Sequence, residues 1–292
     1  MKTLIHNYSS AMTTEPMYLN KCLELCQTPT YLWANEVSAF DIFDATQPDV
    51  FISHYGMLTN DIVKYLSQNK KISTVLNVTG ANEQELESIE QVFLGNKMNI
   101  PFVFTNYHDS LCKNKTKKIK MVNIWPSVDI FLPHSPLPDF KINLAVLATE
   151  MNDLVKRAIA SKETYHLLSL SDTAEGFDLT VNVQSLGNMY GKYDEVLIAS
   201  DVNTVFSQVL FEAALNAKKL SIKVSKKQQG MLDKVLASLF HDDGNKDVGR
   251  LVKQQIKRKH TCVNRAARLC RLLKNEAAAK KLGKIGEQLC EQ

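Results

Sequence analysis

The stretch that decides the fold is 73–106, STVLNVTGANEQELESIEQVFLGNKMNIPFVFTN. Its two ends, 73–78 and 101–106, are short apolar runs of the kind that form buried strands. Between them, 81–94 has apolar residues at helical spacing and acids in its first turns, where the helix dipole favours negative charge. A strand, a helix and a strand in this order predict a parallel sheet covered by helices on both faces.

The same alternation continues on both sides of this stretch, so the pattern predicts an α/β protein. Further strands are expected at 2–7, 49–54, 164–170, 194–200 and 219–225, and further helices at 18–26, 59–67 and 205–217. From 228 onward the pattern becomes entirely helical, with helices expected at 228–240, 247–259, 261–273 and 276–289. Two α/β regions with terminal helices are typical of a two-domain enzyme whose ligand lies in a cleft between them.

The regularity breaks in the middle of the chain. A lysine-rich connector at 113–120 is followed by 122–140, which holds four prolines in 19 residues and therefore predicts a stiff, extended crossing segment. The next stretch, 141–160, is interpreted as one long helix. We place the domain boundary near its end, which gives an N-terminal domain at 1–162 and a C-terminal domain, including the terminal helices, at 163–292.

Composition excludes several classes of protein. The chain has 292 residues and is 45% hydrophobic, without a run that approaches the 18 apolar residues of a membrane span. The start, MKTLIHNYSSAMTTEP, turns polar at His6 and lacks the apolar core of a signal peptide, so we expect a cytoplasmic protein. The six cysteines form no CxxC pair or zinc-type spacing, and no DxD carboxylate pair occurs, so no metal is expected.

The net charge of +4 is unevenly distributed. Residues 1–150 hold 12 Lys, no Arg and 15 acids, whereas the rest holds 23 basic residues and 16 acids. Five of the six arginines lie within 22 residues, from Arg250 to Arg271. This cluster is either a solvated helical face or a contact for the phosphates of a ligand or a nucleic acid.

Polar residues follow each expected strand of the first half, where a parallel sheet builds its binding site. No Walker, GxGxxG, GxSxG or HExxH motif is present. His54 and His108 are the candidate bases because an imidazole accepts a proton near neutral pH; a structural, hydrogen-bonded histidine is the alternative for each. Asp109 and Glu15 are the carboxylate candidates for the same role.

The helix expected at 205–217 provides the candidate phosphate site of the second half. It follows a strand and a loop, and Ser207 is placed to cap its N-terminus, where free N–H groups and the positive end of the dipole favour a phosphate. Glu212 lies five residues further on, where a carboxylate can accept two hydrogen bonds from a ribose diol. An exposed helical glutamate is the alternative interpretation.

The run from Phe206 to Val224 resembles the donor segment of GT-B fold glycosyltransferases, and KHTCVNRAARLCRLL (259–273) is similar to the H-T-x-x-x-R-x-x-x-L helix of the spore-coat-type group. The resemblance implies two Rossmann-like domains facing a central cleft and a UDP-sugar donor. It implies donor binding by Ser207, Gln208 and Glu212. The Arg/Lys pair that many family members aim at the diphosphate is not evident; Lys192 is the candidate for that role, with an exposed loop lysine as the alternative, and Ser10 is a further candidate donor contact. The sequence departs from the family at Asn216–Lys219, where a Gly-Pro turn is usual.

The stretches 5–24, 54–66 and 76–85 also resemble glycosyltransferases of T-even-type bacteriophages, which modify 5-hydroxymethylcytosine in DNA, some with arabinose. This resemblance implies transfer of glucose or arabinose to the hydroxymethyl group of DNA, in the cytoplasm of an infected host, with the target base turned out of the stack. A polysaccharide, lipid or protein acceptor, or a catalytically silent nucleic-acid-binding module, are the alternatives. The sequence leaves the oligomeric state and the stereochemistry open.

Overall fold

A computed structural model describes residues 1–8, 15–107, 111–112, 114–124, 126, 142–170, 175–180, 190–239 and 248–291. These residues form two compact units, which are described separately. Unit 1 comprises the described residues of Met1–Ser9, Glu15–Trp125 and Cys262–Gln292. Unit 2 comprises those of Pro126–Thr261.

Unit 1 is built on a six-stranded parallel sheet with the order β2-β1-β3-β4-β5-β6. Its strands are β1 (Thr3–His6), β2 (Thr30–Trp33), β3 (Val50–His54), β4 (Ser73–Asn77), β5 (Phe102–Thr105) and β6 (Met121–Asn123). Every residue of β1 and β5 is buried, which is why these strands consist of short apolar runs.

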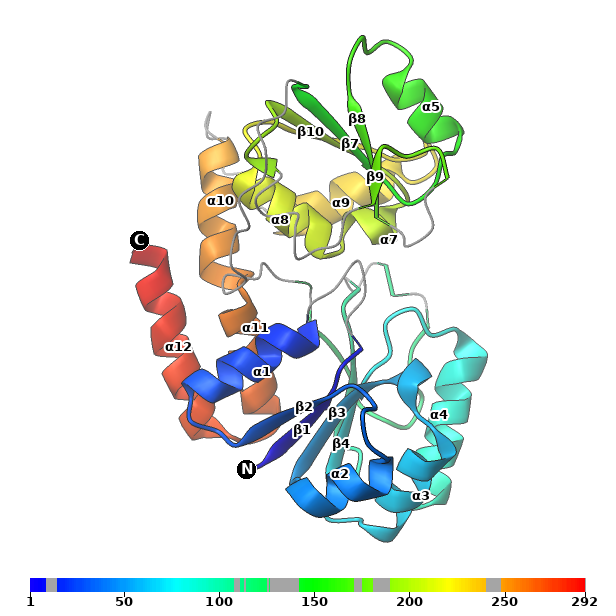
Figure 1. Ribbon diagram of the computed structural model, residues 1–292, viewed down its shortest axis with the longest axis vertical. Coiled ribbons are helices and arrows are strands. Elements are labelled where there is room, and N and C mark those ends of the chain that lie inside the picture. The colour runs from blue at the N-terminus through cyan, green and yellow to red at the C-terminus, as the bar shows by residue number, and fades with distance from the viewer. Residues whose placement is uncertain are drawn as a thin grey trace. The chain divides into compact units, whose positions relative to one another are not determined.

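Helices cover both faces of this sheet (Figure 1). On one face, α2 (Ala39–Thr46), α3 (Asn60–Gln68) and α4 (Glu83–Gly95) pack on a core that includes Phe43, Ile62 and Phe93. The short 3-10 helix η1 (Tyr55–Met57) follows β3. Each α-helix begins at a side-chain cap: Ser38 for α2, Thr59 for α3 and Asn82, in a capping box, for α4.

The other face carries α1 (Glu15–Leu25) together with the last helices of the chain, α11 (Cys262–Leu272) and α12 (Glu276–Glu291). Buried residues of α1, such as Leu19 and Cys22, and of α11, such as Val263 and Leu269, form this layer. The final helices therefore belong to unit 1, whereas the sequence division at 163–292 assigns them to the C-terminal domain. Periodicity shows that a helix is amphipathic but not which sheet it covers.

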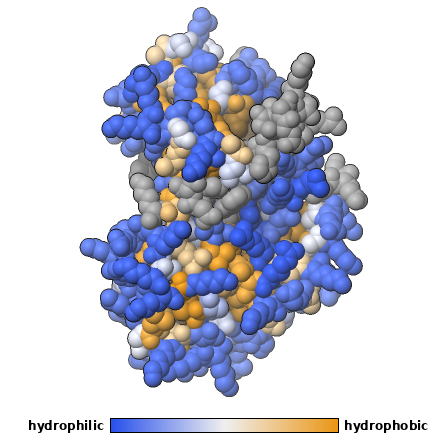
Figure 2. Space-filling model, turned by 180° about the vertical axis from the view of Figure 1, so that it is seen from behind, coloured by the Kyte–Doolittle hydropathy of each residue, from blue (hydrophilic) through white to orange (hydrophobic). Residues whose placement is uncertain are grey.

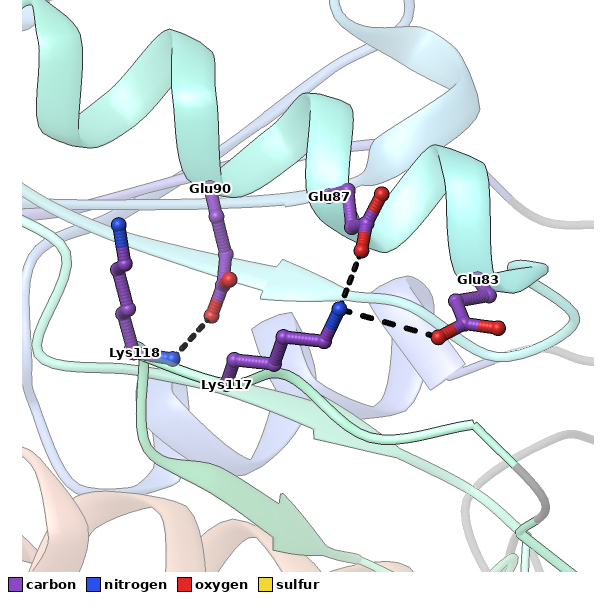
Figure 3. Close-up of polar contacts among 5 residues, drawn as sticks. All are labelled: Glu83, Glu87, Glu90, Lys117 and Lys118. Carbon is purple, nitrogen blue, oxygen red and sulfur yellow. Dashed lines mark hydrogen bonds and ion pairs between the residues drawn. The ribbon is translucent and has the colours of Figure 1, made fainter.

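Helix α4 holds the lysine-rich segment that precedes β6. The buried carboxylate of Glu90 accepts hydrogen bonds from two successive backbone N–H groups, beginning with that of Lys118 at 2.6 Å. Figure 3 shows the Lys117 ammonium between two exposed carboxylates of the same helix, Glu83 and Glu87. Part of the positive charge at 113–120 is therefore neutralised within unit 1.

Unit 2 is built on a five-stranded parallel sheet with the order β11-β10-β7-β8-β9. Its strands are β7 (Leu144–Ala148), β8 (His166–Ser169), β9 (Leu179–Thr180), β10 (Glu195–Ala199) and β11 (Leu220–Lys223). The prediction of one helix over 141–160 is wrong. Its first part is the central strand β7, in which all five residues are buried, and only Asp153–Ile159 forms a helix, α5.

This error also accounts for the difference in domain boundary, because β7 belongs to the second sheet and the second unit therefore begins before residue 162. A fully buried parallel strand is apolar at every position and has no period-2 alternation, so LAVLA is as compatible with a helix as with a strand. The other helices of unit 2 are α7 (Val202–Val205), α8 (Gln208–Asn216), α9 (Gln229–Leu239) and α10 (Val248–Lys259).

The surface in Figure 2 is mostly hydrophilic, with hydrophobic residues grouped on the visible face of unit 1. Among the described residues, large exposed apolar side chains include Tyr31 and Leu32 of the edge strand β2. No described helix is long and apolar enough to cross a membrane.

Candidate functional site

The strand order places one candidate site in each unit. In an open parallel sheet, ligands bind beyond the carboxyl ends of the strands, at the point where the strand order reverses. In unit 1 this point lies between β1 and β3, since β2 is on one side of β1 and β3 to β6 are on the other. In unit 2 it lies between β7 and β10 for the same reason.

Glu15 is the centre of a buried polar network near the carboxyl ends of the strands of unit 1. It is the first residue of α1, and its side chain is 6% exposed. The Tyr8 hydroxyl and the Asn77 amide each donate to Glu15 Oε2 at 2.9 Å, and the Tyr18 hydroxyl donates to Oε1 at 3.5 Å. Asn77 is in turn an acceptor for the Thr79 hydroxyl at 2.6 Å. Residues from β4, α1 and the loop after β1 thus hold one carboxylate.

Burial raises the pKa of the Glu15 carboxyl above its ordinary value, although hydrogen bonds from Tyr8, Asn106, Asn77 and Tyr18 act in the opposite direction. The pKa of the Tyr8 hydroxyl is raised well above its usual range, first by burial and then by the charge of Glu15. Tyr8 therefore remains a hydrogen-bond donor, and Glu15 is a stronger base than an exposed glutamate.

Arg265 brings a positive charge from the end of the chain to this network. It lies on α11, is 6% exposed, and burial lowers its pKa to about 10, while Tyr18 and Glu15 oppose that shift. The arginine cluster is therefore not one solvated face. Arg265 is buried in unit 1, Arg268 and Arg271 are exposed on the same helix, and Arg258 is exposed at the end of α10 in unit 2.

His54 lies at the end of β3 with hydrogen bonds at both ring nitrogens. Its Nδ1 accepts from the backbone N–H of Gly56 at 3.2 Å, and its Nε2 lies 3.3 Å from the carbonyl oxygen of Thr79. Both contacts are satisfied by the neutral ring that carries its proton on Nε2. Burial also lowers the pKa of His54. The other catalytic candidates, His108 and Asp109, and the donor candidate Ser10 lie outside the described residues.

Two hydroxyls meet at the corresponding point of unit 2. Thr149 follows β7 and Ser200 follows β10, and their hydroxyl oxygens are 3.4 Å apart. The next residue, Asp201, caps α7 by accepting from the backbone N–H of Asn203 at 2.9 Å. Thr149 was not a candidate from the sequence, because the stretch 141–160 was expected to be one helix.

Helix α8 begins beside this point, with Ser207 as its N-cap. The Ser207 hydroxyl accepts from the backbone N–H of Val209 at 3.3 Å. Glu212 is 4% exposed, so it is not the exposed glutamate of the alternative interpretation. Its carboxylate accepts from Gln208 and from Asn216, each at 3.4 Å. These distances are at the long end of the hydrogen-bond range.

Tyr190 is a buried residue of unit 2 that the sequence did not indicate, because nothing in its neighbourhood marks it as buried. The side chain is 1% exposed, and burial and the charge of Glu212 raise the pKa of its hydroxyl well above the usual range. Lys192, expected at the diphosphate, is exposed on the turn before β10. In the described part of the chain, no group of three or more His, Cys, Asp or Glu side chains could hold a metal ion.

The fold is therefore α/β, with two Rossmann-like parallel sheets and C-terminal helices, as the sequence predicts. No protein-family model and no curated protein matches the sequence. Among solved structures, the chain is similar to SsfS6, a glycosyltransferase from Streptomyces sp. SF2575, with a TM-score of 0.47, 9% identity and coverage of 93% of this chain and 99% of that one.

The chain is also similar to MnaA of S. aureus, solved with UDP, with a TM-score of 0.46, 13% identity and coverage of 96% of this chain and 98% of that one. A third similar structure is CalG4, the calicheamicin glycosyltransferase, with a TM-score of 0.41, 7% identity and coverage of 94% of this chain and 99% of that one.

Proposed function

We propose that the protein is a GT-B glycosyltransferase that moves a sugar, of the glucose or arabinose class, from a UDP-sugar to the hydroxymethyl group of 5-hydroxymethylcytosine in DNA. The observation that carries the proposal is the start of α8, where Ser207 caps the helix and the buried Glu212 lies five residues further on. This arrangement coincides with the part of the sequence that resembles the donor segment of GT-B enzymes.

The start of α8 suits a nucleotide diphosphate for two reasons. Its first N–H groups and the positive end of its dipole favour an anion. The Glu212 carboxylate holds its amide partners through two hydrogen bonds of 3.4 Å, which the hydroxyls of a ribose can exchange for shorter ones. Gln208 and Asn216, once released from Glu212, remain as polar groups beside the ligand. The proposed donor site uses Ser207, Gln208, Glu212, Lys192 and Ser10.

Unit 1 supplies the base in this proposal. The acceptor oxygen attacks the anomeric carbon, the bond from that carbon to the diphosphate oxygen breaks, and UDP leaves with the electron pair. The proton of the acceptor hydroxyl passes to Glu15, whose pKa is raised by burial. Since both ring nitrogens of His54 have backbone partners, we assign to it the positioning of the loop after β3. His108 and Asp109 remain sequence predictions for the same step.

A DNA acceptor accounts for the exposed basic residues near the C-terminus. Lys257, Arg258 and Lys259 form the last turn of α10, and Arg268 and Arg271 are exposed on α11. Basic side chains bind DNA phosphates with release of counterions, so a DNA-modifying enzyme loses activity steeply as salt increases.

The decisive experiment is mass analysis of DNA that contains 5-hydroxymethylcytosine after incubation with a panel of UDP-sugars. We expect the mass increase of one sugar per modified base with a single donor. We expect Glu212→Ala to reduce transfer about 10- to 150-fold, which corresponds to about 1.5–3 kcal/mol for a lost charge-assisted hydrogen bond. Glu163→Ala, at an exposed position of the same unit, is the matched control and should transfer normally.

Two results would contradict the proposal at different levels. Transfer to an uncharged acceptor, or DNA transfer that is equal at about 50 mM and about 200 mM salt, would remove the DNA acceptor. Absence of transfer with every donor and acceptor, in a folded protein that still binds DNA, would favour a silent nucleic-acid-binding module.

A further inference from the structure

The last two helices of the chain form a hairpin with a strongly basic outer side. Helices α11 and α12 pack against each other in unit 1 (Figure 1). One side of the pair is buried in that unit, through residues such as Leu269 of α11 and Leu282 of α12. The other side is exposed, and its described acids are only Glu276 and Glu287. The basic hairpin face consists of the six exposed basic residues Arg268, Arg271, Lys274, Lys280, Lys281 and Lys284.

The spacing of these residues brings their charges together. On α12, Lys280 and Lys281 are four and three positions before Lys284, which puts the three ammonium groups on one side of the helix. Arg271 of α11 reaches the same place, because a Cβ on Gly283 would lie 3.9 Å from its Nη2. Like charges at such spacing repel one another in the free protein, and a bound anion would relieve that repulsion.

Exposed lysines elsewhere in the protein are paired with carboxylates. Lys218 Nζ lies 2.7 Å from an oxygen of Asp194, and Lys219 Nζ lies 3.0 Å from an oxygen of Glu195. By contrast, none of the ion pairs between described residues includes a side chain of the basic hairpin face. Positive charge gathered on one surface without carboxylate partners is typical of a site that binds a polyanion.

The composition of this face favours a nucleic acid over a lipid surface. Helices that bind in a membrane interface insert large apolar side chains next to their basic residues. The large apolar side chains that are exposed in the described part of the chain include none from α11 or α12. A partner that meets the basic hairpin face therefore meets cations without an apolar anchor, and the phosphates of a DNA backbone suit such contacts.

We propose that the basic hairpin face binds the phosphate backbone of duplex DNA, and that it does so regardless of base sequence and of hydroxymethylation. The inference rests on the proposed function, because it takes the polyanion to be the DNA acceptor. Helix α11 packs on α1, whose first residue is the proposed base Glu15, so this face belongs to the unit that carries the proposed acceptor chemistry. Phosphate contacts hold a protein on DNA, whereas contacts with bases select the site.

The test measures dissociation constants of the full chain for duplex DNA with cytosine or with 5-hydroxymethylcytosine, over a range of salt concentrations. The variant combines Lys280→Ala, Lys281→Ala and Lys284→Ala. We expect it to bind both duplexes at least about tenfold more weakly, and the slope of log Kd against log salt to fall by about 3, one for each lost phosphate contact. Weakening for only one of the two duplexes, or for neither, overturns the inference.

The matched control removes the same charge from another part of unit 1. Lys70→Ala, Lys71→Ala and Lys120→Ala change exposed residues just before β4 and β6, and this variant should bind DNA as the wild type does. Equal weakening by the two triple variants would mean that net charge alone decides binding and would overturn the inference.

A second variant and a second partner complete the test. Alanine is favourable in helices, so the α12 variant should keep the Tm of the wild type. If it does not fold, Arg268→Gln with Arg271→Gln on α11 replaces it, and an unchanged salt slope in that folded variant overturns the inference. Vesicles of phosphatidylglycerol and phosphatidylcholine test a lipid surface. Vesicle binding that the α12 variant loses, with unchanged DNA binding, also overturns it.

Sugar transfer by the same variants distinguishes this inference from the proposed function. If the wild type binds DNA and the α12 variant does not, but no sugar is transferred, the DNA contact stands and the proposed function fails. If sugar is transferred and the α12 variant binds and transfers as the wild type does, the proposed function stands and only the role of the basic hairpin face is overturned.

Discussion

The two units differ in the length of the hydrogen bonds that join their candidate site residues. At the edge of unit 1, Tyr8 and Asn77 each donate to Glu15 at 2.9 Å, and Thr79 donates to Asn77 at 2.6 Å. In unit 2, the contacts of Thr149 with Ser200 and of Gln208 with Glu212 are 3.4 Å long. The same topology thus carries shorter hydrogen bonds around Glu15 in unit 1 than around Glu212 in unit 2.

The difference has a physical meaning for binding. Short, reciprocal hydrogen bonds fix a carboxylate in one geometry before a substrate arrives, which suits a group that must accept a proton at a defined place. Long or unmade hydrogen bonds leave polar groups that gain from a ligand. In the proposed reaction, this difference would suit unit 1 to orienting the acceptor and unit 2 to binding the donor.

The largest expected effect comes from removing the Glu15 carboxylate from the buried network of unit 1. Glu15→Ala should lower the free energy of unfolding by about 3 kcal/mol, because it leaves the buried donors of Tyr8 and Asn77 without their acceptor. Urea denaturation measures the change. Glu24→Ala, exposed on the same helix, should stay within about 0.5 kcal/mol of the wild type. Equal effects of the two variants would show that the hydrogen bonds of Glu15 stabilise the protein no more than the contacts of an exposed glutamate do.

A second substitution compares buried and exposed carboxylates on α4 (Figure 3). Glu90→Ala should lower the free energy of unfolding by about 2 kcal/mol, since the backbone N–H groups of Lys118 and Ile119 lose their acceptor. Glu87→Ala breaks an ion pair with Lys117 between two exposed side chains and should cost about 0.5 kcal/mol or less. The reverse order would mean that the ion pairs, and not Glu90, hold this segment.

A smaller effect is expected for Tyr193 of unit 2, whose hydroxyl contacts His166. Tyr193→Phe should lower the free energy of unfolding by about 1 kcal/mol, the typical net value of one hydrogen bond, because the contact with His166 Nδ1 is lost. Chemical denaturation of Tyr190→Phe should show the opposite change, a higher free energy of unfolding, because the Tyr190 hydroxyl is buried without a partner among the described residues. Two losses of equal size would contradict that distinction.

The smallest effect is a change in pH dependence. Burial lowers the pKa of His54 below 6.5, so the unfolded chain takes up a proton before the folded chain does, and the contribution to stability is lost as pH falls from about 6.5 through the folded-state value. His54→Asn keeps an acceptor for Gly56 and does not titrate. We expect its unfolding free energy to fall less than that of the wild type between pH 8 and pH 5.5. An unchanged slope would contradict a buried, neutral His54.

Much of the α/β pattern could be predicted because its strands are apolar and its helices are capped. The strands at β1, β3, β4, β5, β8, β10 and β11, and the helices from α8 to α12, lie where periodicity places them. Strand β2 was not assigned from the sequence, since it has four residues at a sheet edge and exposes Tyr31 and Leu32. Only Trp33 of this strand is buried, so the sequence has no alternation of apolar and polar residues that would mark a strand.

The site was less predictable than the fold, because it depends on contacts between distant residues. Glu15 was a candidate from its place after the first strand, but its hydrogen bond with Asn77 joins positions 62 residues apart. Arg265 was visible only as one member of a charged cluster, and no local signal separates it from its exposed neighbours Arg268 and Arg271. Only the packing of α11 on α1 reveals which arginine is buried.

The return of α11 and α12 to unit 1 has a consequence for synthesis on the ribosome. Helix α1 buries Leu19, Cys22 and Leu23, but the helix that covers it, α11, begins at Cys262, more than two hundred residues later. The first unit to emerge is therefore the last to be completed, and its apolar layer stays open while the whole of unit 2 is made. A nascent chain of this protein is expected to need protection from aggregation until its final helices leave the exit tunnel.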